Sequence, residues 1–95
     1  MAIQQYETAT ISVAVPSITD PDIAKVDVTV TTPEGVAVGD AVIAAPLEAL
    51  PTNCRLQGCY VTATDTVTLV FGSEGGNVTG ASKDFRFLVF DLTSG

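Results

Sequence analysis

Residues 25–32 have the sequence Lys-Val-Asp-Val-Thr-Val-Thr-Thr, in which polar and apolar side chains alternate from Lys25 to Thr31. Side chains two residues apart lie on the same face of a β-strand. One face of this segment would therefore carry Val26, Val28 and Val30, and the other Lys25, Asp27, Thr29 and Thr31. Such alternation is typical of a strand with one buried and one exposed face. We therefore expect a β-strand over residues 25–32.

The composition of the whole chain agrees with that strand. The 95 residues include thirteen Val and thirteen Thr, and β-branched side chains lose χ1 freedom in helices but pack well on sheets. The longest helix candidate, residues 46–50, ends at Pro51, and proline cannot continue a helix. The composition therefore predicts an all-β protein.

Other alternating or apolar segments predict further strands. We expect them over residues 8–15, 41–45, 60–63, 66–71 and 85–92, with a hairpin tip at Thr64-Asp65 and a long glycine-rich loop over residues 72–84. Short strands at this spacing are typical of a sandwich or barrel. The expected fold is a single β-sandwich domain over residues 1–95, with about six to eight short, mostly antiparallel strands in Greek-key or jelly-roll-like order. A short N-terminal arm, residues 1–7, precedes the first clear strand.

Charge and hydropathy exclude several classes of partner. Four basic against eleven acidic residues give 4 − 11 = −7, whereas a protein that binds phosphate backbones needs a positive surface. No apolar run reaches the roughly 18 residues that a membrane helix requires. The first residues lack the basic and apolar regions of a signal peptide. We therefore expect no nucleic-acid partner, no membrane segment and no secretion signal.

Residues suited to catalysis are scarce. The chain has no His, and general acid–base chemistry otherwise needs carboxylates tuned by their surroundings. Asp20-Pro21-Asp22 could offer oxygen ligands to Ca²⁺ but matches no EF-hand spacing, so solvated turn residues are the favoured interpretation. The glycine-rich residues 72–77 lack the Lys of a phosphate-binding loop. We expect no enzyme activity, no catalytic residue, no cofactor and no metal.

Cys54 and Cys59 lie five positions apart in the sequence. In an extended chain this spans roughly 16 Å, and on a regular strand the two side chains would lie on opposite faces. A disulfide would require the chain to turn between them, which Gly58 permits, and a zinc site would need two further ligands. Without a secretion signal, two reduced thiols are favoured over a disulfide.

The last expected strand is apolar on both faces. Phe85, Phe87 and Val89 would lie on one face, and Leu88, Phe90 and Leu92 on the other, together with Arg86. Two explanations stay open for the second face. Either a loop such as residues 72–84 covers it, or it contacts another subunit.

The N-terminal arm offers two further anchors, Ile3 and Tyr6. The arm could dock on this domain, on another subunit or on the shell, and a contact with an edge strand of another subunit is favoured. The candidate interface residues are therefore Ile3, Tyr6, Leu88, Phe90 and Leu92.

The order of several segments resembles a known group of proteins. Val38-Gly39-Asp40-Ala41-Val42 is followed by an Ala/Leu/Pro linker, Tyr60-Val61-Thr62-Ala63, Val67-Thr68-Leu69-Val70-Phe71, Asn77-Val78-Thr79-Gly80 and an aromatic last strand. This order is similar to that of small β-sandwich modules of tailed bacteriophages, such as head decoration (cement) proteins and fibre-associated domains. It covers residues 36–92, and the stretch from Gly72 to Gly76 departs from it as an apparent insertion.

The resemblance implies a non-enzymatic virion protein on the outer surface of a capsid, made in the host cytoplasm. Its partners would be the major capsid protein or other virion proteins, and it would be a homo-oligomer, with a trimer favoured. The alternative is a carbohydrate- or surface-binding adhesion or fibre module, although the chain has no Trp and only two Tyr to line such a site.

Overall fold

The structure is a computed structural model. It describes residues 4–8, 10–30 and 36–91, and the side chains of residues 4 and 91 are not described. Within these ranges the chain contains seven strands and no helix, so the all-β prediction is confirmed. The strands are β1 (Gln4–Glu7), β2 (Ile11–Val15), β3 (Ile23–Thr29), β4 (Ala41–Pro46), β5 (Cys54–Ala63), β6 (Thr66–Ser73) and β7 (Ala81–Asp91).

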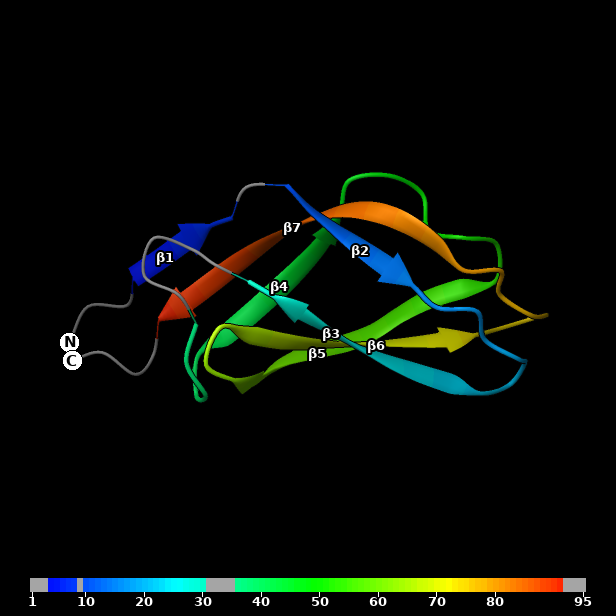
Figure 1. Ribbon diagram of the computed structural model, residues 1–95, viewed down its shortest axis with the longest axis horizontal. Coiled ribbons are helices and arrows are strands. Elements are labelled where there is room, and N and C mark those ends of the chain that lie inside the picture. Colours follow the sequence, from blue (N-terminus) through cyan, green and yellow to red (C-terminus); the bar gives the residue numbers. More distant parts are fainter. Residues whose placement is uncertain (1–3, 9, 31–35, 92–95) are drawn as a thin grey trace.

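The strands form two antiparallel sheets, which Figure 1 shows as two layers. In the first, here called the β7 sheet, β4 pairs with one edge of β7, and β1 and β2 pair one after the other with its opposite edge. In the second, the β6 sheet, β6 lies between β3 and β5. The chain passes repeatedly between the two sheets. Among the described residues, β5 and β6 are the only strands that follow each other in the sequence and also pair with each other, so they form a hairpin.

One hydrophobic core lies between the inward faces of the two sheets. Phe71 of the β6 sheet meets Phe85 of the β7 sheet edge to face, with ring centroids 6.3 Å apart and an interplanar angle of 79°, a preferred arrangement of aromatic rings. Phe85 in turn stacks on Phe87 at 6.2 Å. The alternation that predicts β3 is confirmed, because Val28 and Val30 are buried and Val26 is half-buried.

The expected hairpin tip at Thr64-Asp65 is confirmed, since β5 ends at Ala63 and β6 begins at Thr66. Asp65 has a φ of 60°, a conformation that Asp tolerates better than most residues. Its carbonyl accepts the N–H of Val30 at 2.8 Å, its N–H donates to the carbonyl of Val36 at 2.9 Å, and its carboxylate accepts the N–H of Val36 at 3.2 Å. The tip therefore holds both ends of the segment between Val30 and Val36.

Several element boundaries differ from the sequence prediction, since β2 begins at Ile11 rather than Thr8 and β3 at Ile23 rather than Lys25. β6 continues to Ser73 and β7 begins at Ala81, so the expected loop over residues 72–84 is shorter, and the bridge between Ile18 and Val78 ties it to the β2–β3 connection. β5 begins at Cys54, directly after the linker expected over residues 46–53, and so it starts well before the expected strand centre at Tyr60-Val61-Thr62-Ala63.

The described part of the N-terminal arm, residues 4–7, pairs within its own chain, and the expected contact with another subunit stays a prediction. Residues Gln4–Glu7 form β1, which pairs antiparallel with β7 of the same chain. Tyr6 lies opposite Val89 on the inward face and packs against the core. This pairing gives the backbone groups at the edge of β7 hydrogen-bond partners from the same chain. The expectation of an intersubunit contact had assigned these hydrogen bonds to a strand of another subunit.

Candidate interaction surface

The outward face of β4 is apolar although it is exposed. Val42 and Ala44 are half-buried and pack toward the core, whereas Ala41, Ile43 and Ala45 are exposed. Ile43 is 53% exposed, among the most exposed large hydrophobic residues of the described chain. A strand in a sheet that faces water normally carries polar side chains on its outer face, so this face of β4 is unusual.

The neighbouring face of β7 extends this apolar area. Phe85, Phe87 and Val89 are buried in the core, so Leu88 and Phe90 lie on the outward face, where both are half-buried. Ile43 is directly opposite Leu88, and Ala41 is opposite Phe90. Because residues directly opposite each other in a sheet share a face, these side chains form one surface. We call Ala41, Ile43, Ala45, Leu88 and Phe90 the outer apolar surface.

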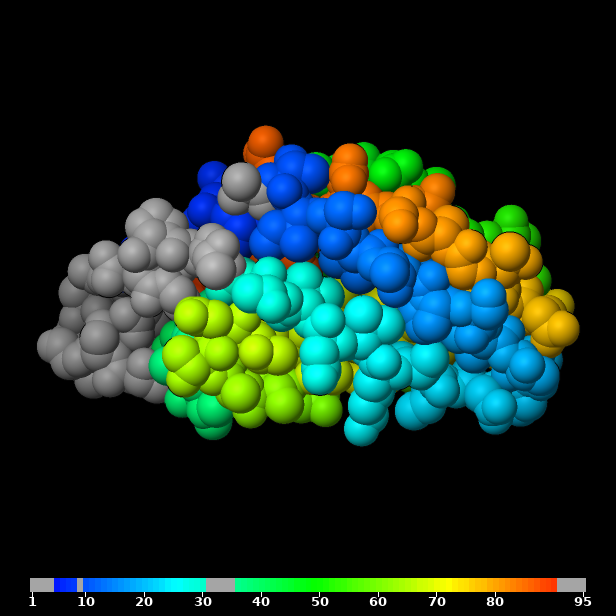
Figure 2. All heavy atoms as spheres, in the orientation of Figure 1, coloured from blue at the N-terminus to red at the C-terminus, as the bar shows by residue number. Residues whose placement is uncertain are grey.

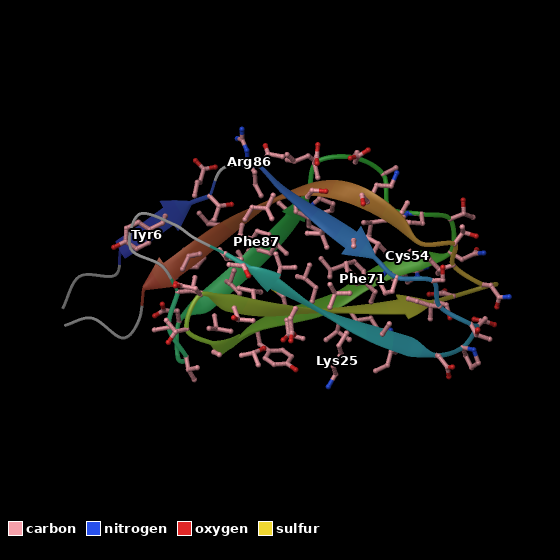
Figure 3. The ribbon with its side chains drawn as sticks, viewed as in Figure 1. Tyr6, Lys25, Cys54, Phe71, Arg86 and Phe87 are labelled. Carbon is pink, nitrogen blue, oxygen red and sulfur yellow. The ribbon has the colours of Figure 1, made fainter. Side chains whose placement is uncertain are left out.

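Polar residues border this surface along β1 and at Arg86. On the other edge of β7, Glu7 is opposite Leu88 and Gln5 is opposite Phe90. Arg86 is opposite Ala45, is exposed, and projects away from the sheet in Figure 3. An apolar centre with a polar rim is the usual anatomy of a protein interface.

The loop that could have covered Leu88 and Phe90 lies elsewhere. The expected cover, residues 72–84, belongs partly to strands and contacts the β2–β3 connection instead. The connection after β4 does return over β7, but at Asp84, whose carbonyl accepts the N–H of Leu47 at 2.9 Å and whose N–H donates to Glu48 Oε2 at 3.0 Å. Of the two explanations for the apolar outer face, cover by residues 72–84 is wrong.

The five candidate residues from the sequence have different positions. Leu88 and Phe90 lie in the outer apolar surface, and Tyr6 packs against the core of its own chain. Ile3 and Leu92 lie outside the described residues. Sequence reasoning missed Ile43 and Ala41, although the signal was present, because residues 41–45 are apolar at every position, as in a strand without a polar face.

Part of the free edge of β4 is already engaged within the chain. The bond from Leu47 N–H to the Asp84 carbonyl continues the β4–β7 register, so by alternation Val42, Ala44 and Pro46 direct their backbone groups away from β7. The carbonyl of Val42 accepts the thiol of Cys59 from the other sheet at 3.3 Å, and Pro46 has no N–H to offer. We therefore assign the interaction surface to the face of β4 rather than to its edge.

The cysteines are free, as favoured from the sequence, but their placement differs from the expectation. The β5–β6 register shifts between Leu56 and Gly58, so Gln57 is an extra residue in a β-bulge. The bulge brings Cys54 and Cys59 to the same inward face, where both pack against the core. Burial raises the pKa of both thiols above the ordinary value of 9.0, and in Cys59 a hydrogen bond with the Ala44 backbone opposes this.

The acidic residues singled out in the sequence serve to hold turns. The carboxylate of Asp20 accepts the hydroxyl of Ser73 at 3.3 Å, and its N–H donates to Asn77 Oδ1 at 2.9 Å. Asp40 Oδ2 accepts the N–H of Ala37 at 2.9 Å. Within residues 4–8, 10–30 and 36–91, no group of three or more His, Cys, Asp or Glu side chains is placed to bind a metal ion.

Comparison of the chain with protein-family models, with curated proteins and with solved structures found no match. Nor does the described part of the chain contain a helix long and apolar enough to cross a membrane.

Proposed function

We propose that the protein is a non-enzymatic structural component of a virion, a capsid decoration (cement) protein that binds the outer surface of the shell and bridges its subunits. Its partner is the major capsid protein or another virion protein. The chain is made in the host cytoplasm and then binds this partner. The observation that carries the proposal is the outer apolar surface on β4 and β7. The resemblance of residues 36–92 to phage head modules supplies the class of partner.

Burial of the outer apolar surface would yield free energy that the isolated chain does not gain. Ile43 leaves about half of its side chain in water, and removal of apolar area from water contributes about 25 cal/mol per Å². Contiguous exposed apolar residues usually mark a site of interaction. Because the surface lies on two paired strands rather than on a loop, docking would order little additional backbone.

The finer description of the fold belongs to the same proposal. Two sheets that share a core, with strands that pass between them at β2–β3, β3–β4 and β4–β5, support a β-sandwich of Greek-key or jelly-roll type. Such folds leave whole sheet faces available for contacts.

The test begins with particles of the phage or prophage that encodes the chain. The particles are purified on a density gradient, and the copy number of the chain is measured by quantitative mass spectrometry against the major capsid protein. A decoration protein is present in a fixed ratio set by the shell lattice. Absence from intact particles would overturn the proposal.

A second measurement tests the surface itself. Particles that lack the chain are titrated with the purified wild type, with Ile43→Asp, and with the control Tyr60→Asp, whose position is 46% exposed on β5 in the other sheet. Ile43→Asp should bind at least about tenfold more weakly, because a charge would be buried in an apolar interface. The control should bind as the wild type does, and equal loss in both variants would show that the surface is not involved.

One observation favours an adhesion module as the second candidate. On the outer face of the β6 sheet, Tyr60 is 46% exposed and lies opposite Thr68. The Thr68 hydroxyl donates to Asp27 Oδ1 at 2.6 Å and also contacts the Thr62 hydroxyl. An exposed ring beside a polar row could bind a sugar. Binding of the chain to a glycan array that Tyr60→Ala abolishes and Ile43→Asp does not would favour this function.

A further inference from the structure

β3 is an edge strand whose outer side is unpaired. In the described part of the chain it pairs with β6 alone, and β2, its nearest neighbour in the other sheet, shares no strand pairing with it. Figure 2 shows β3 in cyan at the surface beside β2 in blue, with no other element over it. Edge strands of this length can receive a further strand unless their sequence prevents it.

The hydrogen bonds show which residues direct their backbone outward. Two bonds at the ends of the β3–β6 register, from Ser73 N–H to the Asp22 carbonyl at 3.2 Å and from Val30 N–H to the Asp65 carbonyl at 2.8 Å, show that the even-numbered residues bond to β6. Because bonded and non-bonded pairs alternate in an antiparallel ladder, the outward groups belong to the odd-numbered residues. These are Ile23, Lys25, Asp27 and Thr29.

The same four residues carry the side chains on the outer face of the sheet. Lys25 and Asp27 lie two positions apart on that face, on either side of Val26, which is the middle residue of the seven in β3. Lys25 has no ion-pair partner among the described residues. The outer edge therefore presents one positive and one negative side chain, placed symmetrically about its centre.

We propose that β3 pairs with β3 of a second copy of this chain, antiparallel about a two-fold axis at Val26. This register places Lys25 of each copy opposite Asp27 of the other and pairs all seven residues of the strand. The outward backbone groups of the four odd-numbered residues bond across the axis, and the two Val26 side chains meet on the inward side. The two β6 sheets join into one sheet of six strands.

Other registers are less favourable. A shift of two residues in one direction places Lys25 opposite Lys25, and in the other direction Asp27 opposite Asp27, and like charges directly opposite each other destabilise a sheet pair. A shift of one residue places the outward odd-numbered residues of one copy opposite even-numbered residues of the other, whose backbone groups already bond to β6, so the ladder cannot form. The charges that often protect an edge strand from pairing here select one symmetric register.

This contact lies on a different sheet from the outer apolar surface, so it goes beyond the proposed function and does not depend on it. It gives a two-fold pair, whereas the resemblance favours a trimer, which needs a different contact between unlike surfaces. The oligomeric state therefore separates the two.

The first experiment measures sedimentation velocity and amide hydrogen exchange by NMR over a concentration series at physiological salt. We expect a monomer–dimer equilibrium. As dimer forms, exchange should slow at the amides of Lys25, Asp27 and Thr29, while those of Val26 and Val28, already bonded to β6, should change little. A chain that stays monomeric, forms a trimer, or dimerises without protection of the odd-numbered amides would overturn the proposal.

The second experiment uses complementary charge reversals. Lys25→Glu gives each chain two negative side chains at the edge, and Asp27→Lys gives two positive ones, so each variant alone should dimerise at least about tenfold more weakly. A mixture of the two variants restores unlike charges at both positions and should form a heterodimer. Loss of association in the singles without recovery in the mixture, with both variants folded, would contradict the register.

Arg86→Glu is the matched control for Lys25→Glu. It changes the net charge of the chain by the same amount, but Arg86 lies on the outer face of the β7 sheet, away from β3. It should leave the dimer dissociation constant within about twofold of the wild type. An equal effect of both reversals would show that overall charge, and not the β3 edge, controls association.

Discussion

At Thr8 a side-chain hydroxyl takes the place of a backbone carbonyl. From Glu7 to Ile11 the chain advances four residues while the paired strand β7 advances three, from Leu88 to Phe85. At this irregularity the N–H of Phe87 donates to Thr8 Oγ1 at 3.0 Å, and the N–H of Thr8 donates to the carbonyl of Phe87 at 3.0 Å. Thr8 is 5% exposed, so water cannot replace its hydroxyl.

Replacement of Thr8 by Val should therefore destabilise the protein by about 1–3 kcal/mol, the cost of a buried donor without a partner. Thr8→Ser keeps the hydroxyl and should lose less than half as much. Urea denaturation of the three proteins measures this, provided that the m-values agree. Equal losses in both variants would mean that the methyl group and not the hydroxyl matters.

The half-buried thiol of Cys59 should make stability depend on pH in the alkaline range. Burial raises its pKa in the folded chain above 9.0, so the unfolded chain releases this proton at a lower pH than the folded chain does. The free energy of unfolding should then fall as the pH rises above 9.0. Cys59→Ala should show a shallower fall than the wild type, because its other titrating groups are unchanged. Parallel curves for the two proteins would show that Cys59 contributes nothing.

Substitutions in β1 can show whether this strand stabilises its own chain or contacts another subunit. Tyr6 packs inward against the core, whereas the adjacent Gln5 is exposed on the opposite face. Tyr6→Ala should therefore reduce the free energy of unfolding of the isolated chain by about 2 kcal/mol, and Gln5→Ala should change it by less than about 0.5 kcal/mol. If Tyr6→Ala left the midpoint unchanged but weakened an assembly, the arm would act between subunits after all.

The strands show what could be predicted from the sequence and what could not. β3 follows from the alternation around Val26 and Val28, and the β5–β6 tip from Thr64-Asp65, because both signals are local. The bulge at Gln57 depends on how β5 fits β6, so the shared inward face of Cys54 and Cys59 could not be derived from their spacing. Likewise, nothing in β1 indicates that its partner is β7, because the paired residues lie between 81 (Glu7 and Leu88) and 87 (Gln4 and Asp91) positions apart in the sequence.

The same limit applies to the candidate surface. Leu88 and Phe90 could be found in the sequence, because a strand that is apolar on both faces is unusual wherever it lies. Ile43 could not be joined to them before the β4–β7 register was known. Pairing between strands places residues opposite each other that are far apart in the sequence, and no local sequence pattern indicates which residues will be opposite.

In the whole molecule the two proposed contacts lie on different sheets, so both can be occupied at once. A pair of chains joined through β3 would present two outer apolar surfaces to the same particle, and linked sites bind more tightly than either alone when the geometry lets both engage. Lys25→Glu should then lower the apparent affinity for particles by about tenfold or more, through loss of the pair, while each monomer keeps its docking surface.

Ile43→Asp should abolish docking and leave the monomer–dimer equilibrium unchanged. Sedimentation and particle titration of both variants measure the two effects separately. If Ile43→Asp also dissolved the dimer while the chain stayed folded, the outer apolar surface would itself be the contact between copies, and the separation of the two surfaces would be wrong.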